Sequence, residues 1–311
     1  VGSTISAFWI LVANSWQQTP AGFIIQNGRA ELIDFWAAIF NPSTFVRFFH
    51  TFIATLITGA FFVAGVSAYL ILKKKEVETM KKSLKIAIIF GFIFSLLELM
   101  PSGHHHARQV AQTQQAKFAA IEGLYRGQSQ APMAIFGVPF ERPPELFAPI
   151  EIPGLLSWMA FGDVNAHVKG INDFPPEDVP PLFLTFVSFH NMVALGMYFI
   201  AITLLGVFLL YKKKLFDNRK YLKVMVWSIP LPVIACQLGW IAAEVGRQPW
   251  IVYGYLRTRD AVSITVPPEQ ILFSLILFGL IYLLLGALYL YILIKEIKHG
   301  PEPLEAKEVA A

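Results

Sequence analysis

The sequence predicts an all-α protein, a polytopic bundle of transmembrane helices with five complete spans, one partial N-terminal span and an extramembrane loop. The first observation is composition, because 55% of the 311 residues are hydrophobic and 15% are charged, whereas soluble domains carry about 25% charged residues. The second is that several uninterrupted apolar runs approach or exceed about 18 residues, the length that crosses a bilayer. The third is that Lys and Arg gather in short clusters beside these runs.

The N-terminal stretch, residues 1–14, is typical of the rear part of an apolar helix. It has neither an initiator Met nor the layout of a signal peptide, so we expect further helices upstream of it. Residues 15–41 are polar and rich in turn residues, and we expect them at a membrane surface.

The complete spans are predicted over residues 42–72, 86–100, 182–211, 222–245 and 271–294. Pro42 and Ser43 are typical of a helix start, and Pro230 and Pro232 predict a kink in the fourth span.

Residues 101–181 are polar, rich in Pro and Gly, and too long for an ordinary connection, which predicts an extramembrane functional loop or small subdomain. The predicted organisation is transmembrane helices in 1–100, an outer loop in 101–181, three transmembrane helices in 182–298 and a cytoplasmic tail in 299–311.

Two basic clusters predict the orientation. Six Lys or Arg lie between Lys73 and Lys85, and six lie between Lys212 and Lys223; short loops rich in these residues stay in the cytoplasm. The path of the chain then places residues 101–181 and the connection 246–270 on the outer face. These clusters explain the formal net charge of +4, so we expect contact with lipid and no nucleic-acid partner.

Intramembrane ligand atoms are few. The single cysteine, Cys236, excludes a thiolate cluster within the chain, so redox chemistry requires a bound cofactor. His50 lies seven residues into its helix and Met192 eleven, depths of about 10 and 16 Å. A His and a Met at similar depth are a known axial pair for a low-spin haem. His190 competes with Met192, and helix hydrogen bonding or simple packing are the alternatives for these side chains.

A polar helix face ends the fourth span. Trp240, Glu244 and Arg247 are spaced i, i+4 and i+7, which predicts that they share one face. Glu244 is a candidate metal ligand or proton-relay group, with Arg247 offsetting its charge or that of a cofactor propionate. The alternative is an ion pair that only fixes the helix end.

The outer loop contains a second candidate site. Residues 112–125 predict a short amphipathic helix in which Lys117 and Glu122, five residues apart, lie about 140° around the axis. They either contact different parts of one ligand or belong to an ordinary solvated helix. We interpret His104, His105 and His106 as surface residues.

Residues 239–250, with the ending Gly-Arg-Gln-Pro-Trp, resemble the signature of subunit I of cytochrome bd oxidases. Weaker similarities follow in the family's order: residues 7–20 resemble its fourth helix, 48–60 its fifth helix, and 117–122 its quinol-loop motif. The resemblance covers nearly all of residues 1–298.

The resemblance implies particular haem ligands. His50 and Met192 would be the axial ligands of a low-spin haem b. Glu244 would ligate a high-spin haem b, with Trp240 beside that haem and Arg247 near haem propionates.

The resemblance also implies a reaction. Lys117 and Glu122 would line a quinol site on the outer face of the bacterial cytoplasmic membrane. Electrons from quinol would reach haem d, where dioxygen is reduced to water, in a complex with a second large membrane subunit and a small single-helix subunit. The loop is short for the family, and His190 stands where other members carry Arg. The family's haem d ligand and proton-channel glutamates belong to N-terminal helices that this sequence lacks.

Two other classes remain open at this point. A four-helix di-haem cytochrome b needs four intramembrane histidines, and only His50 and His190 lie in apolar runs. A haem-free transporter with a gated outer loop would use Glu244 and the proline-broken helix. It leaves the pairing of His50 with Met192 unexplained.

Overall fold

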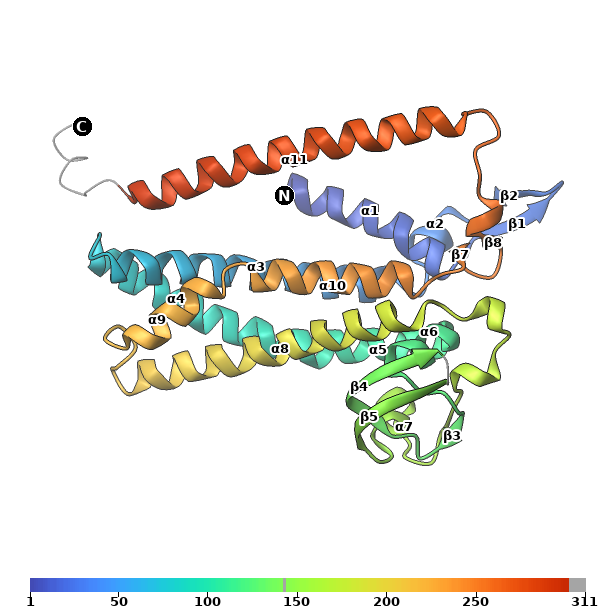
Figure 1. Ribbon diagram of the computed structural model, residues 1–311, viewed down its shortest axis with the longest axis horizontal. Coiled ribbons are helices and arrows are strands. Elements are labelled where there is room, and N and C mark those ends of the chain that lie inside the picture. The colour runs from blue at the N-terminus through green and yellow to red at the C-terminus, as the bar shows by residue number, and fades with distance from the viewer. Residues whose placement is uncertain (142–143, 302–311) are drawn as a thin grey trace.

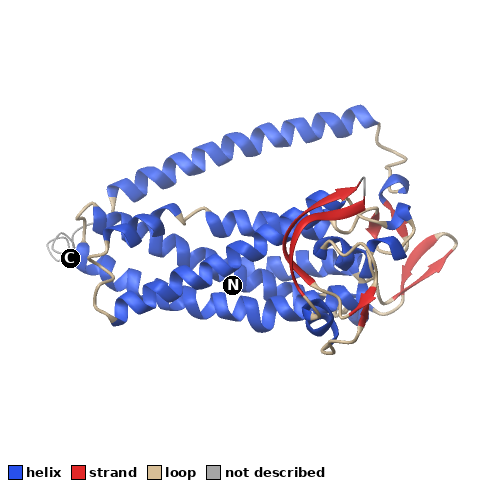
Figure 2. Ribbon diagram, turned by 60° about the horizontal axis from the view of Figure 1, so that its bottom comes forward, coloured by secondary structure: helices blue, strands red, loops and turns tan. Residues whose placement is uncertain are grey.

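The computed structural model describes residues 1–141 and 144–301. Its long helices run side by side, and the β-strands gather at one end of them (Figures 1 and 2). Five helical segments are long and apolar enough to cross a membrane: residues 35–72, 77–113, 182–211, 219–245 and 268–299. The predicted all-α bundle with five spans is therefore confirmed.

The bundle is built from α1 (Gly2–Gln18), α3 (Thr44–Leu72), α4 (Val77–Leu97), α8 (Leu182–Tyr211), α9 (Arg219–Trp227), α10 (Leu231–Val245) and α11 (Pro268–His299). Helix α1 packs against α3, and α8 packs against α4 and α10. Helix α11 runs alongside with none of its residues buried.

Small residues bring the helices close together. A Cβ on Gly65 would lie 2.2 Å from Ile229 Cγ1, and one on Gly206 would lie 2.2 Å from the Tyr221 hydroxyl. Ala64 and Ala68 of α3 are also buried. Within lipid the hydrophobic effect does not favour helix contact, so this close packing is what holds the helices together.

The predicted proline break lies between α9 and α10. Helix α9 ends at Trp227, and Pro230 precedes the first residue of α10. The Ser228 hydroxyl bonds to the Val224 carbonyl and to the Tyr198 hydroxyl, at 2.8 and 2.6 Å. Side-chain hydroxyls thus satisfy polar groups where the proline interrupts the helix.

A second break lies where the third span was expected to end. A kinked segment, Glu98–Gly103, joins α4 to α5 (His104–Thr113), and Met100 within it is extended, with φ −141° and ψ 120°. Pro101 disfavours the helical conformation of the residue before it, which explains the kink. Because the helix resumes, helical structure crosses the expected boundary at residue 100 and continues to Thr113.

The rest of the expected loop is a small folded layer. It comprises α6 (Gln115–Glu122), β3 (Gln128–Ser129), β4 (Met133–Glu141), β5 (Pro144–Ile152), α7 (Leu155–Phe161), β6 (His167–Val168) and the 3₁₀ turns Ile171–Asp173 and Pro176–Asp178. Strands β4 and β5 pair antiparallel. Phe118, Leu124 and Leu156 form part of its buried core.

Two more hairpins lie at the same end of the bundle (Figure 1). The first is β1 (Phe23–Gln26) with β2 (Arg29–Leu32), followed by α2 (Phe35–Ile39); its turn uses Asn27 and Gly28 at φ 52° and 74°. Positive φ at both positions suits a two-residue hairpin turn. The second is β7 (Trp250–Val252) with β8 (Leu256–Arg257), followed by the 3₁₀ turn Thr258–Asp260.

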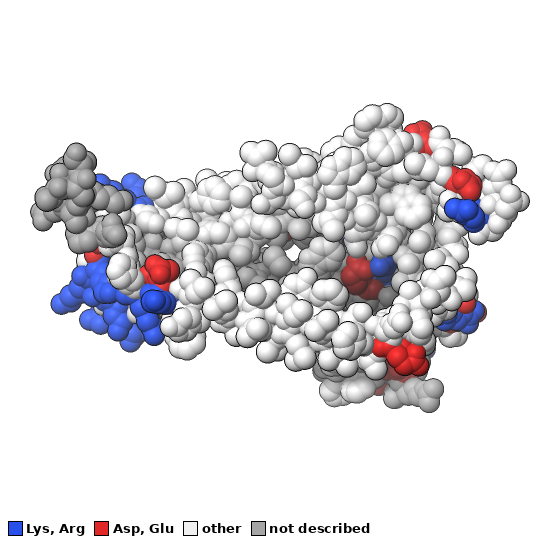
Figure 3. All heavy atoms as spheres, turned by 90° about the horizontal axis from the view of Figure 1, so that it is seen from above, with Lys and Arg blue, Asp and Glu red and all other residues white. Residues whose placement is uncertain are grey.

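Charge divides the two ends of the molecule. Lys and Arg side chains crowd one end in Figure 3, whereas acidic and basic side chains mix at the other. The clusters 73–85 and 212–223 lie at the ends of α3 and α8 that are opposite the hairpins. The residues expected in the cytoplasm and those expected outside thus lie at opposite ends. The tail expected over 299–311 falls outside the described residues from 302 onward.

Candidate functional site

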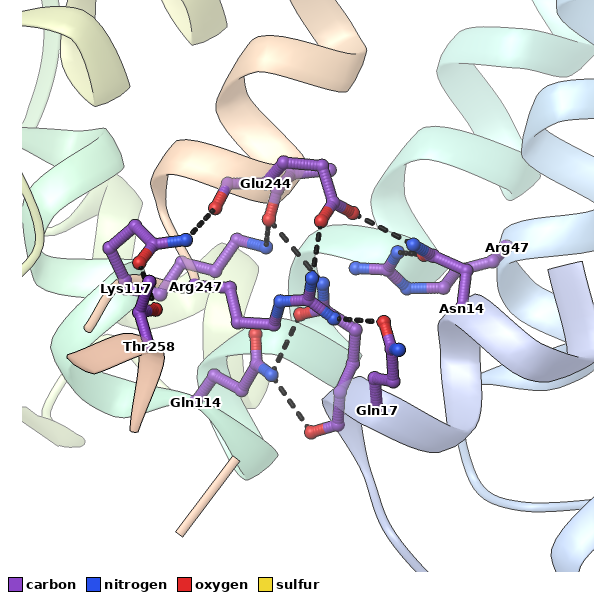
Figure 4. A network of polar contacts seen from close by, with 11 residues as sticks. Asn14, Gln17, Arg47, Gln114, Lys117, Glu244, Arg247 and Thr258 are labelled. Carbon is purple, nitrogen blue, oxygen red and sulfur yellow. Dashed lines mark hydrogen bonds and ion pairs between the residues drawn. The ribbon is translucent and has the colours of Figure 1, made fainter. Parts of the chain in front are cut away.

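Glu244 lies one residue before the end of α10 and is held on both carboxylate oxygens (Figure 4). The Arg247 guanidinium donates to Glu244 Oε2 at 2.5 Å, and the Asn14 amide of α1 donates to Oε1 at 2.8 Å. The side chain of Arg247 is only 7% exposed. The predicted pairing of Glu244 with Arg247 is therefore present, although Arg247 lies just beyond the helix.

Arg47 of α3 is a functional residue that the sequence analysis missed. It is 4% exposed, and its Nη1 donates to Asn14 Oδ1 at 2.7 Å. Asn14 thus bridges Arg47 to Glu244. The detectable signal was an arginine inside an apolar run, three residues before His50.

Lys117 of α6 adds a third buried cation. It is 5% exposed and donates from Nζ to the carbonyl of Ala243 at 2.9 Å. A Cβ on Gly246 would lie 3.1 Å from Lys117 Cε, so the glycine makes room for the lysine. Burial, followed by the charge of Arg47, lowers the pKa of Lys117 well below its usual value.

Glu122 ends the same short helix. It is 5% exposed and makes no hydrogen bond or ion pair with residues 1–141 or 144–301. Burial raises the pKa of its carboxyl group to about 8. All residues of α6 from Ala116 to Glu122 are buried, so the alternative of an ordinary solvated helix is wrong; the burial arises from tertiary packing rather than from the helix's own pattern.

His50 of α3 lies in a polar pocket of three other side chains. Its Nδ1 is 3.2 Å from Glu98 Oε1 and 3.3 Å from Ser102 Oγ. The ring of His106 lies edge-on to it, with centroids 5.0 Å apart. Glu98 and His106 were both missed as site residues.

The interpretation of the three consecutive histidines as surface residues is wrong for His106. His105 is exposed and His104 is partly exposed, but the ring of His106 packs against His50 and its Nε2 is buried without a hydrogen-bond partner among the described residues. His106 faces inward because α5 continues the membrane span beyond the kink instead of starting a loop.

Met192 and His190 of α8 have different surroundings. A Cβ on Gly239 would lie 2.9 Å from Met192 Sδ, so the sulfur rests on the backbone of α10. Both ring nitrogens of His190 lie 3.0 Å from carbonyl oxygens, Nδ1 from Phe186 and Nε2 from Ala134. His190 therefore ties α8 to β4, with both of its ring nitrogens engaged.

Trp240 lies one turn before Glu244 on α10 and is 36% exposed. Its indole donates no hydrogen bond within the described part of the chain. Its role beside a haem stays a prediction.

The buried charges around Glu244 do not balance. Three basic side chains, Arg47, Lys117 and Arg247, lie around the single carboxyl group of Glu244. The Nε atoms of both arginines are buried and have no hydrogen-bond partner within the part of the chain that the structure describes. Unpaired buried charge costs several kcal/mol, so the cluster is suited to an additional anionic group.

A haem fits these residues better than a bare metal ion does. Within residues 1–141 and 144–301 no three His, Cys, Asp or Glu side chains gather to hold an ion. A haem iron needs one or two axial ligands from the protein, and its propionates are anions that arginine binds well. The arginine Nε atoms without a partner among the described residues match the second need, and the imidazole and thioether of His50 and Met192 are of the ligand types that match the first.

The fold and the site define a multi-pass helical membrane protein with a cation-rich cofactor site at the end that carries the hairpins. The sequence profile described as "Cytochrome bd terminal oxidase subunit I" matches residues 1–301. The chain belongs to this family, whose members are haem-containing subunits of terminal respiratory quinol oxidases. Membership confirms the resemblance first noted in residues 239–250.

Individual proteins that are similar to the chain are also subunits of bd-type oxidases. The chain is 41% identical to "Cytochrome bd ubiquinol oxidase subunit 1" of Bacillus subtilis, over 97% of this chain and 66% of the relative. It is 27% identical to "Cytochrome bd-II ubiquinol oxidase subunit 1" of Escherichia coli, over 99% and 73%. The solved structure of bd oxidase from Geobacillus thermodenitrificans superposes with a TM-score of 0.88 at 31% identity, covering 96% of this chain and 68% of that one. The chain thus spans about two thirds of the length of such relatives.

Proposed function

We propose that the chain is the haem-carrying part of a quinol:dioxygen oxidoreductase of the cytochrome bd type. The observation that carries the proposal is the surplus of buried positive charge from Arg47, Lys117 and Arg247 around Glu244. It supports binding of an anionic cofactor at the end of α10. A haem-free transporter would not require an excess of buried basic side chains in addition to His50 and Met192.

Two haem sites are assigned. His50 and Met192, from α3 and α8, are the axial ligands of a low-spin haem b. Glu244 is a ligand of a high-spin haem b, with Trp240 beside it. When bound, these haems act as one-electron carriers between quinol and dioxygen.

Arg47 and Arg247 are assigned to bind the haem propionates. Arg47 and Arg247 each keep an unpartnered Nε, and a guanidinium binds a carboxylate through parallel hydrogen bonds. With haem bound, Glu244 would hold the iron and Arg247 would pair with a propionate, which would reduce the excess of basic groups around Glu244.

Lys117 and Glu122 are assigned to quinol oxidation. The Lys117 amine donates a hydrogen bond and orients one oxygen of the quinol ring. A carboxyl pKa of about 8 suits a group that exchanges protons near neutral pH, so Glu122 accepts a proton from a quinol hydroxyl. The proton leaves on the outer face, as the basic clusters at the opposite end predict.

Dioxygen reduction is assigned to haem d. The partners are a second large membrane subunit and a small single-helix subunit in the bacterial cytoplasmic membrane.

The first experiment is a dithionite-reduced minus oxidised optical spectrum of the full-length complex. We expect a low-spin b-type band that is lost or displaced in Met192→Leu and absent in His50→Ala. His105→Ala is the matched control, because it removes an exposed imidazole of α5. An unchanged band in the Met192 and His50 variants contradicts the ligand assignment, and a complete lack of haem absorbance favours the transporter.

A further inference from the structure

We infer that Glu98 is a positioning residue for the low-spin haem, because its carboxyl group holds the imidazole of His50 by Nδ1 and leaves Nε2 for the iron. The inference rests on the proposed assignment of His50 as an axial ligand. It concerns a residue of the third span that no step above uses.

The contact is direct and enclosed. Glu98 Oε1 lies 3.2 Å from His50 Nδ1, with the two side chains 17% and 21% exposed. The other carboxyl oxygen, Oε2, is buried without a partner. A carboxyl group at this depth is costly unless it has a specific task.

The kinked segment places Glu98 here. It is the first residue of Glu98–Gly103, and Ser102 of the same segment lies 3.3 Å from the same nitrogen. A Cβ on Gly103 would lie 3.8 Å from His50 Cε1 and 2.8 Å from the Glu98 carbonyl. Pro101 causes the kink. The break in the helix brings Glu98 Oε1 and Ser102 Oγ to the same ring nitrogen of His50, Nδ1.

Hydrogen bonding at the distal nitrogen has known consequences for a metal-bound histidine. It fixes the tautomer and the ring orientation, and it makes the coordinating nitrogen more basic. A more basic ligand favours ferric over ferrous iron. Glu98 therefore lowers the reduction potential of the low-spin haem relative to an unsupported histidine.

A purely structural contact between α3 and α4 is the competing explanation. It predicts that loss of Glu98 changes the stability of the complex and the yield of haem but not the potential of the haem that remains. The potential is therefore the decisive measurement.

The test is a spectroelectrochemical titration of the low-spin band in the purified full complex. Glu98→Gln keeps an acceptor oxygen but removes the carboxylate, and we expect the ferric-to-ferrous ratio at a fixed potential to fall about tenfold, a rise of about 59 mV for one electron. Glu98→Asp keeps the charge and should return the potential toward that of the unmodified protein.

Ser95→Ala is the matched control, because Ser95 Oγ is a buried, unpartnered oxygen of the same helix that does not contact His50. It should leave the potential unchanged. An unchanged potential in Glu98→Gln, with the band present, overturns the inference alone. A low-spin band that survives in His50→Ala overturns the underlying ligand assignment instead.

Discussion

At the scale of single residues, the site is dominated by charges that a bilayer does not tolerate alone. Arg47, Lys117 and Arg247 are each at most 6% exposed, and Glu244 balances one of them. Their arrangement makes sense as a preformed receptor for an acidic cofactor. Each cation should therefore affect cofactor content more than it affects the fold.

Arg47→Leu tests this directly. Removing a buried cation with an orphaned Nε should lower the content of high-spin haem severalfold, because a propionate would lose its partner. The amplitude of the high-spin haem b band per protein, in the reduced minus oxidised optical spectrum, reports the effect. Arg29→Leu, in the exposed strand β2, is the control and should keep full content. Equal haem content in both variants would contradict the propionate role.

Glu122 predicts a pH dependence of stability. Its folded-state pKa is about 8, against an ordinary value of 4.5, so the folded state binds the extra proton between these pH values. The contribution of Glu122 to stability should therefore fall as pH rises from 4.5 to 8. Thermal unfolding of the complex at a series of pH values should show a smaller decline for Glu122→Gln than for the unmodified protein.

The same variant should slow quinol oxidation by roughly 10²-fold, because a positioned proton acceptor is lost. Glu31→Gln, an exposed carboxyl in β2, controls for a change of charge at the same end of the bundle. If the rate of quinol oxidation depends on pH in the same way for Glu122→Gln and for the unmodified protein, the raised pKa assigned to Glu122 is wrong.

At the scale of elements, the contact between α8 and α10 controls the position of a ligand. The backbone of Gly239 supports the Met192 sulfur, and any Cβ there would approach within 2.9 Å. Real Cβ atoms do not approach neighbours so closely, so the Met192 side chain or one of the two helices must shift.

Gly239→Ala should therefore displace or abolish the low-spin band without altering any ligand residue. Gly279→Ala of α11 is the matched control, because nothing lies within 4 Å of its Cβ. The position and amplitude of the low-spin band are compared in optical spectra of the two variants. An unperturbed band in Gly239→Ala would show that Met192 does not depend on α10.

At the scale of the whole molecule, charge separation between the two ends predicts the topology in the membrane. In a Cys236→Ala background, a cysteine at Asp163 should react with a membrane-impermeant maleimide added to intact cells, and one at Lys213 should not. The reverse labelling pattern would invert the predicted orientation. Labelling after lysis confirms that both positions are reactive.

Local sequence patterns predicted most of the fold. The bounds of α8 follow from an apolar run with lysines at its end, and the break before α10 follows from Pro230. The continuation of helical structure beyond Met100 was missed, because Pro101 interrupts the helix locally and α5 begins again directly after the kink.

Only some residues of the site were predicted from the sequence, for a similar reason. His50, Met192, Glu244, Arg247, Lys117 and Glu122 were singled out by residue type and resemblance. Arg47, Glu98 and His106 were not, since their importance depends on neighbours from other helices. The burial of α6 could not be inferred from its own sequence, because it arises from contact with α8 and its neighbours.

The hydrogen bond from Lys117 Nζ to the carbonyl of Ala243 joins α6 to the residue immediately before Glu244. By the proposed assignments, quinol binding at Lys117 and haem binding at Glu244 share this hydrogen bond. A quinol that accepts the hydrogen bond from Lys117 would free the last turn of α10, and binding free energies are reciprocal. Haem binding at that turn would then change the affinity for quinol by the same factor.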